Sequence, residues 1–196
     1  WALNGKDMIG HVIYGPAASG LRPKIADALL IAEACPFKPD QIIILSVSDY
    51  RSFAQPGTQG LAACSVGGYI SRKDGALVLH EFGHSFGKLN DEYFNYIEGY
   101  NTVPYTGLNC QTTQEGAEAE WGDITGTGSG DGLIGYYSSC GDDTGSGSSL
   151  IRPTDNSIMK DLDEGGFFDV NKRIIEEEIK QQTGSVTSTG TYNLRK

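Results

Sequence analysis

Residues 75–93 read Gly-Ala-Leu-Val-Leu-His-Glu-Phe-Gly-His-Ser-Phe-Gly-Lys-Leu-Asn-Asp-Glu-Tyr, and they hold the segment around which we expect the fold to be built. The first part of this stretch predicts a helix over Gly75 to Phe86. Apolar side chains occupy most of the circumference of that helix, so we expect it to lie buried under a sheet. Polar groups on it then need partners. The apolar residues are Leu77, Val78, Leu79, Phe82 and Phe86.

Two histidines and a glutamate on this helix match the pattern His-Glu-x-x-His, at His80, Glu81 and His84. Imidazoles one turn apart project from one helix face, where they can bind a single zinc ion. Glu81 lies roughly 100° round the helix from His80, close enough to accept a proton from zinc-bound water. The alternative, two core histidines bonded to the backbone, is the weaker interpretation because the chain has only three histidines.

The chain is expected to return to the metal after the helix, because catalytic zinc usually has three protein ligands and a fourth position for water. Gly87 follows His84 by three residues, and we expect it to end the helix with a positive φ. Asn90 is a poor zinc ligand because its amide oxygen is neutral, which leaves Asp91 and Glu92 as carboxylate candidates. We expect one of the two to ligate the metal and the other to orient a histidine.

Upstream of this helix the sequence reads strand, helix, strand, which predicts an α/β layout with a partly parallel sheet. His11 to Gly15 gives a first strand. A helix then begins near Pro23, where the missing N–H donor is not needed, and Cys35-Pro36 ends it. The run from Gln41 to Val47 is rich in Ile and Val and predicts a buried strand, and Leu61 to Ile70 adds one or two more.

Downstream, the chain is expected to be loop-like from Gly99 to Gly147, because the glycine-rich tracts there cannot sustain long regular elements. Asp169 then caps a final helix, and Gly184 stops it. A chain of 196 residues falls within the usual size of one domain. We therefore expect residues 1–184 to form one domain and residues 185–196 to form a polar tail.

The excess negative charge is confined to one stretch of the chain. Residues 110–169 carry twelve Asp or Glu against two basic side chains, whereas the remaining residues carry thirteen of each sign. Nucleic acids and anionic membranes are poor partners for such a chain, because both require clustered Lys and Arg. A solvated acidic surface is the preferred interpretation. The alternatives are attraction of basic substrates and calcium sites drawn from Asp123, Asp131, Asp142 and Asp143.

The cysteine content indicates an oxidising compartment. Four widely spaced cysteines fit two disulfides outside the cytoplasm, with free buried thiols as the alternative. No apolar run approaches the roughly 18 to 20 residues that cross a bilayer. No signal-type segment is present, so we expect Trp1 to follow a processing or trimming site. The expected location is secreted, cell-surface or periplasmic. The four cysteines are Cys35, Cys64, Cys110 and Cys140.

Residues 80–93, His-Glu-Phe-Gly-His-Ser-Phe-Gly-Lys-Leu-Asn-Asp-Glu-Tyr, closely resemble the signature of the M64 metallopeptidases, the IgA-peptidase or igalysin family of metzincin-like enzymes. Residues 152–159, Arg-Pro-Thr-Asp-Asn-Ser-Ile-Met, look like the family's Arg-Pro-Thr segment that leads to a methionine. The resemblance covers roughly residues 25–179. It implies a metzincin-like α/β fold, with a mixed twisted sheet over the active-site helix and a loop-rich lower part that ends in a C-terminal helix. It also implies that Met159 packs beneath the zinc site.

The same resemblance implies a zinc-dependent endopeptidase that acts on protein or peptide substrates, with Glu81 as general base. A metzincin-type third ligand is expected ten residues after the first histidine, where this chain has Asn90, so the ligand is shifted. We prefer Asp91 over Glu92 because it is nearer in register. One alternative is a non-catalytic zinc-containing binding or adhesion domain derived from a peptidase. Another is a metal-dependent hydrolase such as a deacetylase or amidase. The sequence indicates no particular substrate or oligomeric state.

Overall fold

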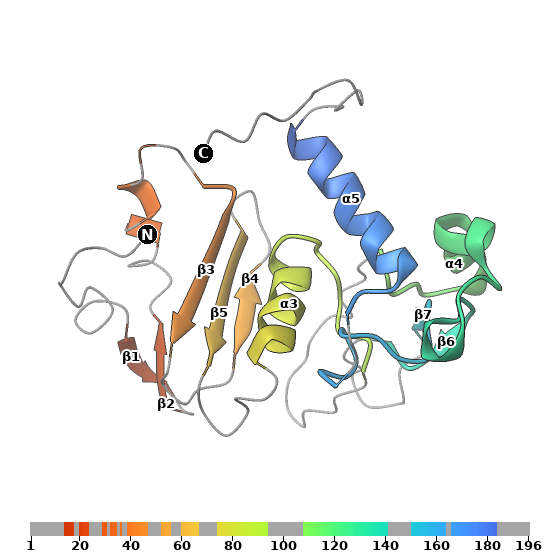
Figure 1. The fold of residues 1–196 in the computed structure, drawn as a ribbon, viewed down its shortest axis with the longest axis horizontal. Coiled ribbons are helices and arrows are strands. Elements are labelled where there is room, and N and C mark those ends of the chain that lie inside the picture. Colours follow the sequence, from red (N-terminus) through yellow and green to blue (C-terminus); the bar gives the residue numbers. More distant parts are fainter. Residues whose placement is uncertain are drawn as a thin grey trace, which may run out of the picture.

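The computed structural model describes residues 14–17, 20–23, 29–30, 32–34, 36, 39–46, 52–55, 60–66, 74–93, 108–140, 150–163 and 166–183. Within these residues the fold is mixed α/β, with small sheets and α-helices. Strands β1 to β5 lie at one end of the molecule, helix α4 with strands β6 and β7 lies at the other, and helix α3 stands between them (Figure 1). None of the described helices is long and apolar enough to cross a membrane.

The central sheet has three strands in the order β3-β5-β4. Strand β3 (Gln41–Ser46) confirms the predicted strand but not its burial, because Ile43 and Leu45 are exposed. It pairs in parallel with β5 (Gly60–Ser65), which confirms a partly parallel sheet. Strand β4 (Phe53–Gln55) pairs antiparallel with the other edge of β5. It was not predicted, because three residues are too short to show the alternating pattern of a strand.

A hairpin precedes this sheet and replaces the start of the predicted first helix. Strand β1 (Tyr14–Ala17) pairs antiparallel with β2 (Gly20–Pro23), so the first predicted strand overlaps β1 only at its end. The prediction that a helix begins near Pro23 is wrong, because Pro23 closes a strand. A fixed φ and a missing N–H suit a short edge strand as well as a first helical turn. Residues 29, 30, 32 and 33 are helical.

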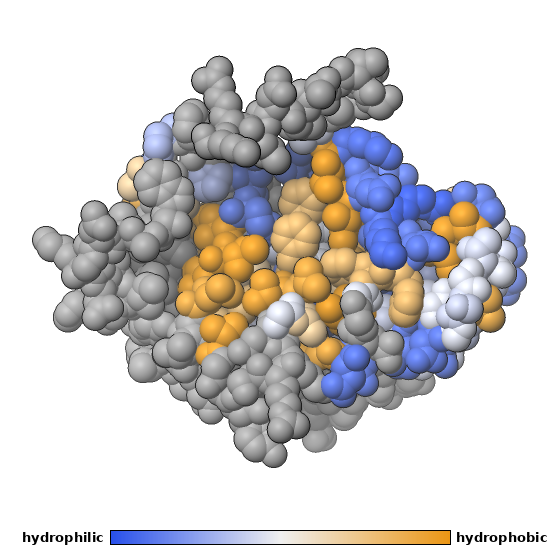
Figure 2. All heavy atoms as spheres, viewed as in Figure 1, coloured by the Kyte–Doolittle hydropathy of each residue, from blue (hydrophilic) through white to orange (hydrophobic). Residues whose placement is uncertain are grey.

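Helix α3 spans Asp74–Ser85 and confirms the predicted helix. The expectation that the apolar residues of this helix are buried under a sheet is wrong at Leu79: Leu77 is buried, but Leu79 is 45% exposed. Figure 2 shows apolar residues at the surface over the middle of this face of the molecule, and Ile43 and Leu45 of β3 are also exposed. The helix instead buries a polar side. The buried polar residues of α3 are His80, Glu81 and Ser85.

Helix α4 (Gln114–Trp121) lies inside the stretch predicted to be loop-like, so that prediction is wrong at these residues. The Thr113 hydroxyl caps the helix by accepting a hydrogen bond from the Gly116 N–H at 3.1 Å. Ala117 and Trp121, one turn apart, are both fully buried. A helix of two turns with one apolar pair gives little periodic signal, and it is stabilised by tertiary packing rather than by propensity.

Helix α5 (Asp169–Thr183) confirms the predicted final helix at both ends. The strands β6 (Tyr137–Ser138) and β7 (Ile151–Arg152) form a short antiparallel pair, and two single turns of 3-10 helix, η2 (Gly122–Ile124) and η3 (Gly130–Gly132), precede them. One apolar core joins α4, α5 and the segments between them. Its buried members are Leu89, Ala117, Trp121, Ile134, Ile158, Met159, Val170 and Ile174.

The end of α3 is built differently from the prediction at Gly87. The residue with positive φ is Lys88, at 54°, and its N–H donates to the His84 carbonyl at 3.2 Å, which is a left-handed helix cap. Glycine is needed at 87 for space. A Cβ atom there would lie 2.9 Å from the carbonyl oxygen of Gly83 and 2.9 Å from the side chain of Ile175 on α5. Gly87 therefore allows α5 to pack closely against the end of α3.

Cys110 and Cys140 form a disulfide, which is compatible with a protein of an oxidising compartment. The expectation of a second disulfide is wrong, because Cys64 on β5 is a free, buried thiol. Burial, together with the nearby Glu81 carboxylate, raises the pKa of Cys64 to about 12. The thiol therefore stays protonated at neutral pH. Cys35 lies outside the described residues.

Candidate metal centre

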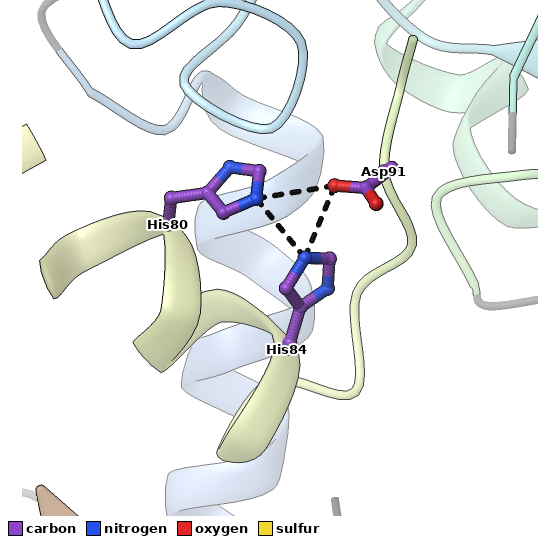
Figure 3. Close-up of side chains that lie close together, drawn as sticks. All are labelled: His80, His84 and Asp91. Atoms are coloured by element: carbon purple, nitrogen blue, oxygen red, sulfur yellow. Dashed lines mark hydrogen bonds and ion pairs between the residues drawn. The ribbon is translucent and has the colours of Figure 1, made fainter. Parts of the chain in front are cut away.

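Three side chains converge beside the C-terminal half of α3. His80 and His84 point from one face of the helix toward Asp91, which lies on the segment that follows it (Figure 3). Nε2 of each histidine lies 3.1 Å from Oδ1 of Asp91, and the two Nε2 atoms lie 3.1 Å from each other. We call these residues the metal group. Among the described residues it is the one set of three His, Cys, Asp or Glu side chains that could hold a metal ion.

The spacing of the three atoms fits a small tetrahedral ion. Zinc binds imidazole nitrogen and carboxylate oxygen at about 2.0–2.2 Å, so two ligands at a tetrahedral angle lie about 3.3 to 3.5 Å apart. The separations of 3.1 Å in the metal group are close to that value. Two nitrogens and one oxygen also suit other first-row transition metals. The three residues could therefore hold a metal ion, and their geometry does not select one particular metal.

Both histidines are oriented by backbone carbonyls. Nδ1 of His80 lies 2.9 Å from the carbonyl oxygen of Ile158, and Nδ1 of His84 lies 2.6 Å from that of Leu89. A carbonyl can only accept, so Nδ1 carries the proton on each ring. A neutral ring then presents the lone pair of Nε2 to a metal, whereas a ring that is also protonated on Nε2 donates to Asp91. Metal-binding histidines typically have this arrangement, in which the second ring nitrogen donates to a fixed acceptor. The metal group is thus ready to bind before an ion arrives.

Charge within the metal group favours an ionised carboxylate. Burial acts to raise the pKa of Asp91, but hydrogen bonds and charge from His80 and His84 outweigh it and hold that pKa well below its usual range. Burial acts to lower the pKa of His84, and the hydrogen bonds to Asp91 and the Leu89 carbonyl reverse this, so the pKa ends above its ordinary value of 6.5. A proton on His84 would therefore compete with a metal for the same nitrogen.

Glu92, the other carboxylate candidate, lies outside the metal group. It is fully buried, and its Oε1 accepts from Asn109 Nδ2 at 3.1 Å and from Asn171 Nδ2 at 2.8 Å. Its Oε2 accepts from the Ser157 hydroxyl at 2.8 Å. Burial raises the pKa of Glu92, against the opposing effect of these donors and of Arg152. We call Glu92, Asn109, Ser157 and Asn171 the Glu92 network.

Glu92 was expected to orient a histidine if it did not bind the metal, and it does so only through the backbone. Its N–H donates to the carbonyl oxygen of Met159 at 2.9 Å, and the Met159 N–H donates to the hydroxyl of Ser157 at 3.1 Å. Ile158, between those two residues, supplies the carbonyl that orients His80. Glu92 therefore fixes the segment that holds the histidine, without contacting the ring.

Glu81 is buried on α3 next to the metal group, with 5% of its surface exposed. Its charge acts on two neighbours, since it contributes to raising the pKa of both His84 and Cys64. Glu81 is thus close enough to His84 and to Cys64 of β5 for its charge to act on both side chains. A buried glutamate in this position has the chemistry of a proton acceptor beside a metal.

Met159 packs against helix α3. It is fully buried, and a Cβ atom built on Gly83 would lie 2.7 Å from its sulfur. Gly83 stands between His80 and His84 in the chain, so the methionine contacts α3 close to the two histidines, and its role beneath a zinc site stays a prediction. The ring of Tyr93 also stacks on that of His80, with centroids 6.5 Å apart and an angle of 15° between the planes.

Among its described residues, the acidic stretch contributes none to the metal group. Asp123 accepts from Nη1 of Arg173 at 2.9 Å with both carboxylate oxygens, and this ion pair lowers the pKa of Asp123. Asp131 lies in η3 and does not belong to the group of described side chains that could hold a metal ion. Asp142 and Asp143 lie outside the described residues. A calcium site in this stretch stays a prediction.

Sequence reasoning missed three buried polar residues near the site, Asn109, Ser157 and Asn171. Each contacts Glu92, which is distant from it in the sequence, and none belongs to a pattern that predicts a ligand. Comparison of the chain with models of known protein families and with curated proteins finds no match. The functional assignment therefore rests on the residues and their geometry.

Proposed function

We propose that this chain is a zinc-dependent endopeptidase with a metzincin-like fold, which hydrolyses peptide bonds in protein substrates. The observation that carries the proposal is the metal group itself. Two imidazole nitrogens and one carboxylate oxygen lie 3.1 Å from one another, with both Nδ1 atoms held by carbonyls. Three protein ligands with room for a fourth are typical of catalytic rather than structural zinc. The likeness of residues 80–93 to the M64 signature supports the same reaction class.

The chain would supply the proton transfers of this reaction. His80, His84 and Asp91 would hold the zinc, which would supply an activated water and a Lewis acid for the scissile carbonyl. Glu81 would accept a proton from the attacking water and deliver it to the leaving amine. Its position one residue after His80, buried beside the metal group, supports this role. Asp91 stays ionised and holds both imidazoles in place, because its pKa lies below the usual range.

A non-catalytic zinc-containing binding domain is the competing proposal. A structural zinc site normally has four protein ligands and needs no general base. The described residues offer three ligands and a buried glutamate beside them. These features favour catalysis over binding alone. A secreted or cell-surface location fits the Cys110–Cys140 disulfide, and protein or peptide segments are the proposed substrates.

The test compares Glu81→Gln with the wild type. The substitution removes the base and leaves the three ligands, so we expect zinc content and melting temperature to stay close to those of the wild type. The rate of peptide cleavage, measured on a broad mixture of peptides from many proteins, should fall by a factor on the order of 10² to 10⁴. Glu115→Gln makes the same chemical change at an exposed residue of α4 and should leave turnover unchanged.

The two functions predict different results in this experiment. Zinc in the wild type with no cleavage of any digest would favour the binding domain. Near-normal turnover by Glu81→Gln would remove Glu81 from the mechanism. His84→Ala serves as the metal control, because it should lose zinc and turnover together.

A further inference from the structure

One side chain from elsewhere in the chain binds both ends of residues 90–92, the segment that carries the third ligand. Asn109 is fully buried, and its Oδ1 accepts from the Asn90 N–H at 2.8 Å. Its Nδ2 donates to the Asn90 carbonyl at 3.0 Å and to Glu92 Oε1 at 3.1 Å. A single amide thus binds the residue before Asp91 through its backbone and the residue after it through its side chain.

The disulfide supports the same segment from behind. Cys110 follows Asn109 in the chain, and its sulfur lies 3.6 Å from the carbonyl oxygen of Asp91. The sulfur of Cys140 lies 3.7 Å from that oxygen and 3.6 Å from the Asn109 carbonyl. The covalent link therefore fixes Asn109 and packs against the main chain of Asp91. Neither group touches the metal-facing oxygen.

The side chain of Asp91 is short and 23% exposed, so a shift of its backbone would also move its carboxylate. Its Oδ1 meets both imidazoles at 3.1 Å, and a shift of about 1 Å would take it out of the ligand range of a shared metal. Asn109 binds the backbone next to Asp91 rather than the carboxylate. A loss of Asn109 should therefore alter metal affinity through position, without removing a ligand.

We propose that Asn109 is a positioning residue for the third metal ligand, which keeps Asp91 within reach of His80 and His84. The inference rests on the metal site that the proposed function requires. Residues that orient metal ligands typically contribute 10-fold to 100-fold to metal affinity. We expect Asn109→Ala to weaken zinc binding by a factor in that range.

Asn171→Ala is the matched control. Asn171 is also buried and donates to the same Glu92 oxygen, at 2.8 Å, but it makes no described hydrogen bond to the backbone of residues 90–92. Both variants should lower the melting temperature of the metal-free protein. Only Asn109→Ala should also weaken zinc, measured by competition with a chelator at a temperature well below both melting points.

The possible results distinguish this proposal from the proposed peptidase function. Equal zinc affinity in the two variants would assign Asn109 a purely structural role, while the peptidase proposal would stand. Zinc binding by the wild type without peptide cleavage would remove the peptidase and leave this inference intact, whereas a wild type that binds no zinc would remove both. If Asn109→Ala does not fold, hydrogen exchange in the metal-free wild type gives the answer. The backbone N–H of Asn90 should be protected from hydrogen exchange. Exchange at the rate of an exposed peptide would exclude its hydrogen bond to Asn109.

Discussion

Asp91 and Glu92 are neighbours in the chain and occupy two unlike regions of the molecule. Asp91 belongs to the metal group, where its side chain is 23% exposed and meets two imidazoles. Glu92 belongs to the Glu92 network, is fully buried and meets two amides and a hydroxyl. The pKa of Asp91 is lowered and that of Glu92 is raised. The same functional group therefore serves as a candidate ligand in one region and as a structural link in the other.

The difference shows that partners, rather than residue type, decide what a carboxylate does. A neutral histidine ring beside Asp91 can offer the lone pair of Nε2 to a metal that the carboxylate also binds. Amide and hydroxyl donors instead occupy both oxygens of Glu92 at a fully buried position. Substitutions at Asp91 and at Glu92 test this difference.

The largest expected effect is the loss of stability in Glu92→Ala. The change leaves buried donors of Asn109, Ser157 and Asn171 without their acceptor, so the unfolding free energy should fall by about 3–5 kcal/mol. Urea denaturation of the chelator-treated protein measures it. Asp91→Ala is the control and should cost about 1 kcal/mol or less, since its carboxylate is partly solvated. Equal losses in the two variants would contradict the division between the regions.

The second effect is the loss of metal affinity in Asp91→Ala. Removal of a ligand should weaken zinc by more than about 100-fold, which corresponds to about 2.7 kcal/mol. Glu92→Gln keeps the shape of the buried side chain and should weaken zinc by about tenfold or less. Chelator competition on both variants provides the comparison. If Glu92→Gln lost as much affinity as Asp91→Ala, Glu92 would have to be reassigned as a ligand.

The smallest effect is the pH dependence, which should have opposite signs in the two regions. Zinc affinity should fall by about tenfold per pH unit, or about 1.4 kcal/mol, below the pKa of His84, because one proton displaces the metal. That pKa is raised above 6.5, so the fall begins at a higher pH than for an ordinary histidine. The folded pKa of Glu92 is raised above 4.5, so its contribution to stability is complete below about 4.5 and is lost as the pH rises through the folded pKa.

Two measurements check these signs. Zinc affinity of the wild type is followed across pH by chelator competition. Unfolding free energies of the metal-free wild type and Glu92→Gln are compared over the same range. If the stability of the wild type relative to Glu92→Gln increased as the pH rose, the pKa of Glu92 would not be raised.

Local patterns in the sequence predicted the elements that carry the metal group. Periodicity gave α3, α5 and the parallel strands, and the spacing of His80 and His84 on one helix turn gave two of the three candidate ligands. Their place after His84 made Asp91 and Glu92 both candidates for the third ligand, and the preference for Asp91 came from the register that the family resemblance implies. Helix α4 and strand β4 were missed because each is too short to show a period.

The Glu92 network could not be predicted for a different reason. Its members lie 17, 65 and 79 residues from Glu92 in the sequence, and asparagine and serine are common in loops. Only the folded chain shows that they meet. The positive φ at Lys88 was likewise assigned to Gly87, because the sequence does not show that α5 packs against the glycine.

The hydrogen bond between His80 and the Ile158 carbonyl has a consequence for the order in which the chain becomes ordered. Its two partners are 78 residues apart in the sequence. Closing so long a loop costs conformational entropy, and this cost slows the formation of the contact. During synthesis both histidines leave the ribosome well before their acceptor on residue 158 exists. A nascent chain can therefore display the complete His-Glu-x-x-His helix while the ring of His80 still rotates freely. Orientation of that ring is acquired late, when the C-terminal third of the chain docks, so the incomplete polypeptide carries the histidines without the aligned site.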